Sequence, residues 1–348
     1  MEEDLDYASA EQQELDYGQG AAEVIWAEKN ANKEALNTTD LPITNSGMDM
    51  SKLTNEQFAI SRRQGFGGSD ASILIGANPY TKTYMEVHGR DGITEPLVVQ
   101  KAREQLTESE KKVGELAAVR KGNDLEALIM NKAAEAMGIE IRKPTHLYRF
   151  TDTPYLAMNF DGVGVFVKPE KNEVVDPNAY RKELEVINNK YDGEFDVLYK
   201  APDFSWVANH HGYAPVEIKV ATTTGQRKYE AIKAIYSEER LYKQLDPWRE
   251  APTPLTPEEL RVMSIEEKAH YFGIPIYYYP QVQQEMMALD ANGGFLAVMF
   301  DVSWQMHIFY VQKDPYVQNQ IVIEGYKAAK TVNDIVRKQG RPEVMQLG

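Results

Sequence analysis

Residues 215–220 read Pro-Val-Glu-Ile-Lys-Val and predict a β-strand in the core of the protein. Successive side chains of a strand point to opposite faces, so the aliphatic residues would line one face while Glu217 and Lys219 stand together on the other. A carboxylate beside an ammonium suits metal-assisted phosphodiester hydrolysis, because the carboxylate ligates Mg²⁺ and the lysine orients or deprotonates the attacking water. The alternative is a half-buried strand with a solvated Glu/Lys face, so other parts of the chain must distinguish the two.

The composition limits the class of protein. The chain has 348 residues, 43% of them hydrophobic, which is enough for one large domain with extensions. It contains no cysteine, which excludes disulfides, Cys-bound zinc and thiol nucleophiles. No apolar run approaches the roughly 18 to 20 residues of a membrane span, and the N-terminus is acidic where a signal peptide would be basic. We expect no membrane partner and a cytoplasmic location.

The acidic charge is concentrated at the N-terminus. The formal net charge is −15, and residues 1–50 carry −10 of it, with 12 Asp or Glu against Lys29 and Lys33. These residues are interpreted as a mostly disordered acidic arm, because like charges repel and few apolar residues are present. The remaining −5 does not exclude DNA as a partner, because bound metal neutralises carboxylates in a nuclease site.

Residues 51–348 are predicted to form a single domain with an insertion at about 168–214 and a long loop at about 237–270. Strands are expected between 139 and 167, at 295–300 and at 307–311, and helices at 281–289 and 314–337. The pair His210-His211 is weak support for a metal site, because adjacent residues of an extended segment point to opposite faces.

A glycine-rich turn precedes an apolar segment at residues 65–75. Ser69 is predicted to cap the helix that follows, and the free N–H groups of a helix start attract anions. Arg62 lies close by in the sequence, so the two residues can form a phosphate site. A buried helix that starts with Gly-Gly-Ser and binds no ligand is the alternative.

Two further acids are candidates for a metal site. Asn123 is the predicted N-cap of a helix that ends at Gly138. Glu126 lies three residues after this cap, at position N3, so it can either complete a capping box or bind metal. Asp161 stands before Gly162 at a bend between apolar runs, where aspartate is also common for conformational reasons.

These pieces follow one another in an order that resembles the YqaJ-like viral recombinase branch of the PD-(D/E)XK nuclease superfamily, which is similar to lambda exonuclease. The matching pieces are Arg62 through Asp70, Gly122-Asn-x-x-Glu126, Phe160-Asp161-Gly162, Glu217-Ile-Lys219 and Tyr277-Tyr-Tyr-Pro-Gln-Val-Gln283. The family usually has proline where Phe160 stands, and its spacing between the acids that match Asp161 and Glu217 is shorter.

The resemblance implies a fold and a site. The fold would be α/β, with a PD-(D/E)XK (restriction-endonuclease-like) core in which helices flank a central mixed sheet. The implied metal ligands are Glu126, Asp161, Glu217 and the Ile218 carbonyl, with Lys219 as the catalytic lysine. Gln281 would support the site from a late helix, with Gln283 as a rival for that role. Arg62 and Ser69 would bind a DNA 5′-phosphate.

The resemblance also implies an activity and partners. The chain would be a deoxyribonuclease that digests one strand of linear duplex DNA processively in the 5′→3′ direction and leaves 3′ single-stranded tails for phage recombination. Two Mg²⁺ ions per site are expected, with Mn²⁺ as a substitute, because the ligands are all oxygen atoms. A homo-oligomeric ring, a single-strand annealing protein as partner, and the cytoplasm of a bacterium or phage-infected host are also implied.

Two alternatives stay open. The same core can belong to an endonuclease or a single-strand nuclease, or to a catalytically inactive protein that binds DNA or a partner. The presence of all four candidate catalytic residues, Glu126, Asp161, Glu217 and Lys219, argues against the inactive protein.

Overall fold

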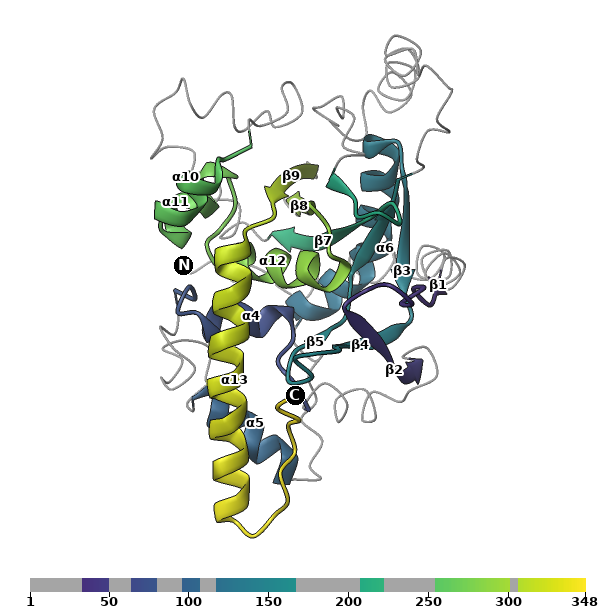
Figure 1. Ribbon diagram of the computed structural model, residues 1–348. Coiled ribbons are helices and arrows are strands. Elements are labelled where there is room, and N and C mark those ends of the chain that lie inside the picture. The colour runs from purple at the N-terminus through teal and green to yellow at the C-terminus, as the bar shows by residue number, and fades with distance from the viewer. Residues whose placement is uncertain are drawn as a thin grey trace, which may run out of the picture.

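The computed structural model describes residues 33–49, 64–79, 96–106, 117–166, 207–221, 254–300 and 306–348. Within them a six-stranded sheet has the order β1-β3-β6-β7-β8-β9 (Figure 1). Its strands are β1 (Lys33–Glu34), β3 (Glu140–Pro144), β6 (Gly162–Val165), β7 (Tyr213–Ala221), β8 (Gly293–Phe300) and β9 (Met306–Gln312).

The sheet is mixed, and its centre is a parallel pair. β7 runs parallel to β8 with Glu217 opposite Leu296, whereas β6 pairs with β7 and β9 with β8 in antiparallel register. Every residue of β8 is buried, as is typical of a strand with parallel pairing and both faces covered. The strand that carries Glu217 therefore lies inside the sheet rather than at its edge.

Helices cover both faces of this sheet. α6 (Ala117–Met137) packs against β3, β7 and β8, and α12 (Tyr278–Leu289) packs against β7 and β8 from the other side (Figure 1). α12 also contacts three further helices. They are α4 (Gly68–Leu74), α11 (Ile265–Tyr271) and the long α13 (Pro315–Lys338), which in turn packs against α5 (Leu97–Leu106). This arrangement confirms the predicted α/β class with a central mixed sheet between helices.

A second, three-stranded sheet corrects the prediction for the N-terminal arm. It has the order β2-β4-β5, with β2 (Ile43–Asp49), β4 (His146–Phe150) and β5 (Ala157–Met158). β2 pairs antiparallel with β4, and Ile43 is only 1% exposed. Residues 33–49 are thus part of the folded domain, because a few apolar side chains of this acidic segment reach the core. Residues 1–32 lie outside the described part of the chain.

The region expected to be a loop at about 237–270 was also predicted wrongly in its second half. It contains α10 (Pro257–Val262) and α11, which begin after Thr256 and Ser264. Each of these caps accepts a hydrogen bond from the backbone N–H three residues on, and Glu259 and Glu267 complete the capping boxes. Residues 167–206 and 222–253 lie outside the described residues. The first of these ranges contains most of the insertion that was expected at about 168–214.

Most other expected elements are confirmed, with one shift. Strands β3 to β6 occupy the interval 139–167, and β8, β9, α12 and α13 lie where they were expected. Gly138 has φ = 63° directly after α6, as predicted for the end of that helix. However, α6 already begins at Ala117, so Asn123 is an interior residue and not the N-cap.

The β2 strand supports a direct test of the corrected arm. Ile43→Ala should lower the free energy of unfolding by about 2–4 kcal/mol, because it leaves a cavity in a packed core. The neighbouring exposed Thr44→Ala should change it by less than about 1 kcal/mol. Urea denaturation of both variants checks this expectation, and equal stabilities would mean that residues 33–49 do not fold with the domain.

Candidate active site

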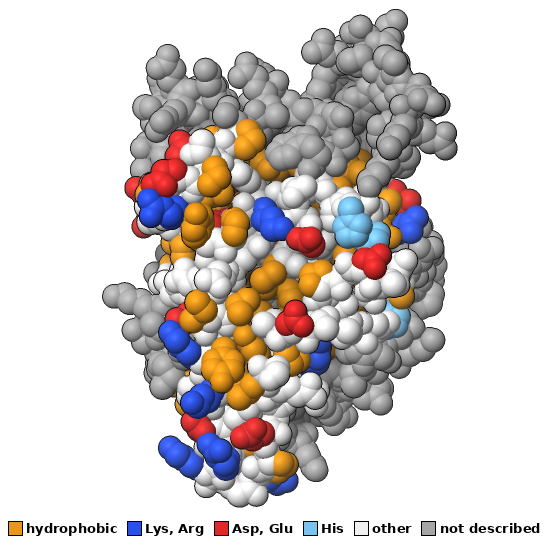
Figure 2. Space-filling model, viewed as in Figure 1, with side chains coloured by type: hydrophobic (Ala, Val, Ile, Leu, Met, Phe, Trp, Pro, Cys, Tyr) orange, Lys and Arg blue, Asp and Glu red, His pale blue; other side chains and the backbone are white. Residues whose placement is uncertain are grey.

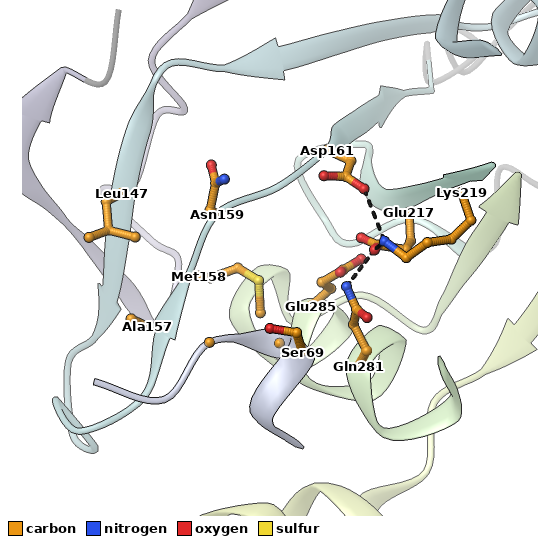
Figure 3. Close-up of a pocket in the computed structure, with 12 residues that line it drawn as sticks. Ser69, Leu147, Ala157, Met158, Asn159, Asp161, Glu217, Lys219, Gln281 and Glu285 are labelled. Carbon is orange, nitrogen blue, oxygen red and sulfur yellow. Dashed lines mark hydrogen bonds and ion pairs between the residues drawn. The ribbon is translucent and has the colours of Figure 1, made fainter. Parts of the chain in front are cut away.

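One cavity of about 180 Å³ lies between β7, α12, α4 and the strand β5 (Figure 3). It collects side chains that are far apart in the sequence: Ser69, Asp161, Glu217, Lys219, Gln281 and Glu285 line it together with Gly67, Gly68, Leu147, Ala157, Met158 and Asn159. Figure 3 shows the charged group at one end and the apolar side chains of Leu147 and Ala157 at the other. The cavity thus combines a charged centre with an apolar wall.

The charged centre is built on β7. Glu217 is 1% exposed, and its carboxylate contacts the Lys219 ammonium on the same face of the strand. Asp161, just before β6, lies on the other side of that ammonium at 3.5 Å and accepts a hydrogen bond from the Ile218 N–H at 3.2 Å. The two-residue period of β7 brings Glu217 and Lys219 together, and the pairing of β6 with β7 adds Asp161.

Helix α12 supplies two more polar groups to the same centre. The Gln281 amide donates to a Glu217 carboxylate oxygen, and Glu285, one turn later, is hydrogen-bonded to Glu217 through its side chain. Glu285 is 1% exposed, and one of its carboxylate oxygens has no hydrogen-bond partner within the described part of the chain. Glu285 did not figure in the sequence analysis. The i, i+4 spacing from Gln281 was the available signal, because it places both side chains on one face of a helix.

The buried carboxyl groups have unusual proton affinities. Burial, and then the negative charge of Asp161, raise the pKa of Glu217 to about 7, against the opposing effect of Lys219. Burial, and then the proximity of Glu217, raise the pKa of Glu285 well above its usual range. Glu285 therefore favours its protonated form beside Glu217 more strongly than an ordinary glutamate does.

Lys219 is an ammonium in this arrangement. Burial alone would lower the pKa of Lys219, but the carboxylates of Glu217 and Asp161 outweigh it and raise the pKa above its usual value. The ammonium also lies 5.7 Å from the centre of the Tyr278 ring, within the range of a cation–π contact. Of the two functions that the sequence allowed for this lysine, a charged donor that orients a reactant fits these surroundings better than a base.

Gln283, the rival of Gln281, points elsewhere. Its amide donates to the Gln312 carbonyl at 2.7 Å and accepts from the Asp314 N–H at 2.8 Å. Gln283 therefore joins the end of β9 to the start of α13, and Gln281 is the one of the two that reaches the cavity.

The glycine-rich turn has a different cap from the one predicted. α4 begins after Gly67, and the Asp70 carboxylate accepts from the Gly67 N–H at 2.9 Å, so Ser69 is an exposed residue of the first turn. The Lys101 ammonium binds Asp70 at 2.8 Å and the Gly65 carbonyl at 3.1 Å, which fixes the turn against α5. Ser69 lines the cavity. Arg62 lies outside the described residues.

Glu126 is separated from the other acids. It lies on α6 and forms an ion pair with Lys143 at the end of β3, and it is absent from the described residues that line the cavity. The structure therefore brings Asp161, Glu217, Lys219 and Gln281 together but leaves Glu126 beside a lysine.

The donor set fits a divalent cation with oxygen ligands. The carboxylates of Asp161 and Glu217 flank a single positive group, and the free carboxyl oxygen of Glu285 is buried beside them. Hard cations such as Mg²⁺ prefer such oxygen atoms, and no histidine or cysteine lines the described cavity.

Comparison with known proteins decides the family. The family model described as "YqaJ-like viral recombinase domain" matches residues 57–241, more than half of the chain. The chain belongs to this family. Membership supports a nuclease that acts on DNA with divalent metal ions. The position of Asp161 directly before β6, beside Glu217 and Lys219 on the paired strand β7, agrees with a PD-(D/E)XK core.

Similar solved structures include two of one alkaline exonuclease. The structure of LHK-Exo from Laribacter hongkongensis is 9% identical, with a TM-score of 0.42, and the structure of LHK-Exo in complex with dAMP is 10% identical, with a TM-score of 0.44. Each match covers 82% of this chain and 98% of the other. No curated protein matches the sequence significantly. None of the described helices is long and apolar enough to cross a membrane.

The different positions of Gln281 and Gln283 predict different effects of their substitution on stability and on activity. Gln283→Ala should lower the free energy of unfolding by about 1–3 kcal/mol, because it leaves buried backbone groups without partners. Gln281→Ala should have a smaller effect on stability and should reduce nuclease activity. Denaturation and activity of the two variants check this, and the reverse pattern would make Gln283 the functional residue.

The raised pKa of Glu217 predicts a pH-dependent stability of the metal-free protein. A carboxyl whose pKa is about 7 in the folded state and about 4.5 when unfolded binds more protons folded, so its contribution to stability is lost as pH rises through that interval. The stability of Glu217→Gln relative to the wild type should therefore rise between pH 5 and pH 8, by about 3 kcal/mol at most.

Thermal unfolding in EDTA measures this difference, with the exposed Glu266→Gln as control. A constant difference between Glu217→Gln and the wild type across the range would show that Glu217 ionises normally.

Proposed function

We propose that this protein is a metal-dependent exonuclease that digests one strand of linear duplex DNA in the 5′→3′ direction, in support of phage-type recombination. The observation that carries the proposal is the convergence of Asp161, Glu217 and Lys219 in one cavity, with Gln281 fixing the Glu217 carboxylate. The direction, the processivity and the link to recombination rest on the family resemblance.

In this proposal the residues have distinct functions. Asp161, Glu217 and the Ile218 carbonyl would hold the metal, with two Mg²⁺ ions expected and Mn²⁺ as a substitute. Bound metal lowers the pKa of a water molecule and stabilises the leaving oxygen. The Lys219 ammonium would orient the attacking water or a phosphate oxygen, because it is charged and already fixed between two carboxylates.

The α12 side chains would act on the ligand Glu217 rather than on DNA. Gln281 and Glu285 both bond to its carboxylate, so they restrict its rotation and favour one orientation towards the cavity. Glu126 remains part of the proposed site only if Lys143 releases it, because the two are ion-paired in the structure.

The 5′-phosphate would bind near Ser69. Ser69 lines the cavity together with Gly67 and Gly68, where the α4 backbone approaches α12 closely. A side chain at Gly68 would meet the Gln281 side chain at 3.2 Å, so glycine permits this approach. Arg62 would add the positive charge that a terminal phosphate requires. A homo-oligomeric ring on duplex ends and an annealing protein as partner belong to the same proposal.

Digestion of end-labelled linear and closed circular duplex DNA with Mg²⁺ tests the proposal. We expect linear DNA to be degraded from its 5′-phosphorylated ends and circular DNA to remain intact. Cleavage of circular DNA would favour an endonuclease, and binding without cleavage of either substrate would favour an inactive binding protein.

Substitutions in the cavity should separate chemistry from folding. Asp161→Asn, Glu217→Gln and Lys219→Met should each reduce the cleavage rate by at least about 100-fold while DNA binding persists. The first two remove proposed metal ligands, and the third removes the ammonium that would orient a reactant. Gel-based cleavage and DNA-binding assays measure both properties. Wild-type cleavage by any of the three purified variants would contradict the assignment.

Glu126→Gln distinguishes the two interpretations of this residue. If Glu126 serves only the ion pair with Lys143, the variant should keep cleavage within a few-fold of the wild type, and Lys143→Met should behave in the same way. A loss of cleavage as large as that of Asp161→Asn, with Lys143→Met unaffected, would return Glu126 to the metal site.

A further inference from the structure

The turn before β7 brings the side chains of His210 and His211 together. The sequence suggested an extended segment here. The structure instead has a tight turn, in which Gly212 has φ = 81°. The two imidazole rings consequently lie with their centroids 3.9 Å apart. In Figure 2 a pair of histidine side chains is visible at the surface, with acidic side chains beside it.

The turn is held rigidly by Asn209, which is 5% exposed. Its side-chain oxygen accepts from the N–H groups of His211 at 2.8 Å and Tyr213 at 3.0 Å, and its amide donates to the Leu289 carbonyl at 2.6 Å. The last contact fixes the turn to the end of α12. The paired orientation of the imidazoles therefore starts from an ordered backbone.

A carboxylate from a distant part of the chain completes the group. Asp40 precedes β2, next to the buried Leu41, and its carboxylate oxygen lies 3.7 Å from Nε2 of His211. The three side chains offer one ligand atom each, from Asp40, His210 and His211, and these atoms lie within 4.8 Å of one another. No other group of three His, Asp or Glu side chains in the described residues meets this spacing. None of the three lines the cavity around Glu217.

The ring nitrogen Nε2 of His211 has no hydrogen-bond partner among the described residues. Nε2 is buried, and the 3.7 Å separation from Asp40 is too long for a hydrogen bond. A metal ion would satisfy the buried nitrogen and the carboxylate at once.

We propose that Asp40, His210 and His211 form a second metal site that binds Zn²⁺ or a similar transition-metal ion. Two imidazole nitrogens and one carboxylate oxygen suit zinc, whereas the all-oxygen donors of the cavity suit Mg²⁺. Zinc ligands lie about 2.0–2.2 Å from the ion, so the three side chains need a small rotation to close on it, with water as the fourth ligand.

The site would link two segments that are distant in the sequence. Asp40 belongs to the segment that leads into β2, and the histidines belong to the turn that leads into β7, the strand of Glu217 and Lys219. A bound ion would therefore stabilise the folded state by joining the N-terminal segment to the central sheet, in proportion to its affinity for the folded protein.

Zinc titration of the full-length, metal-stripped protein in excess Mg²⁺ tests the proposal. Calorimetry and thermal unfolding should show one more zinc ion bound by the wild type than by Asp40→Ala, His210→Ala or His211→Ala, and a zinc-induced rise in Tm that these variants lose. His146→Ala, which changes a histidine on β4, should keep both properties.

Excess Mg²⁺ competes with zinc in the cavity around Glu217. Zinc that still binds there contributes equally to the wild type and to the variants, so it cancels in the comparison. The exposed His210 gives a variant with little expected effect on folding, so the test does not depend on His211→Ala being stable. Equal zinc stoichiometry and an equal Tm shift in the wild type and His210→Ala would overturn the proposal. The zinc site is tested separately from the nuclease activity, so the cleavage rate of Glu217→Gln does not enter this test.

Discussion

The burial of polar side chains around α12 is the constraint on which the rest of the structure depends. Gln283, Gln284 and Glu285 are each at most 1% exposed, and burial of such groups costs several kcal/mol unless they find partners. Gln284 donates to the carbonyls of Phe66 and Ala157, both at 3.1 Å, and so positions the glycine-rich turn beside β5. The hydrogen-bond partners that the buried side chains of α12 require thus bring the start of α4, β5, the end of β9 and the start of α13 together around this helix.

The sequence was sufficient wherever a local periodicity determined the structure. The alternation in β7 predicted that Glu217 and Lys219 would share a face, and Asp161 before Gly162 was expected at the same centre. Gln281 was expected near the site from the family resemblance, and the structure places its amide against Glu217. The same reasoning missed α10 and α11, although Thr256 and Ser264 each precede a glutamate at capping-box spacing.

Contacts between distant segments were beyond such patterns. Nothing near Glu126 indicated that Lys143, on a following strand, would neutralise it. Glu285 resembled an ordinary polar helix residue, because only the tertiary packing reveals that its face is buried. In the same way, Asp40 and His211 are 171 positions apart, and their approach depends on β2 joining β4.

The ammonium of Lys219 lies where the carboxylates of Asp161 and Glu217 most need a positive charge. The metal-free centre therefore holds a tethered cation that compensates part of its negative charge, and the raised pKa of Glu285 reduces that charge further. In the proposed nuclease, folding would then not require the magnesium ion. Binding of Mg²⁺ would then displace the Lys219 ammonium from the carboxylates of Asp161 and Glu217. A newly synthesised molecule would be folded but inactive until the ion binds.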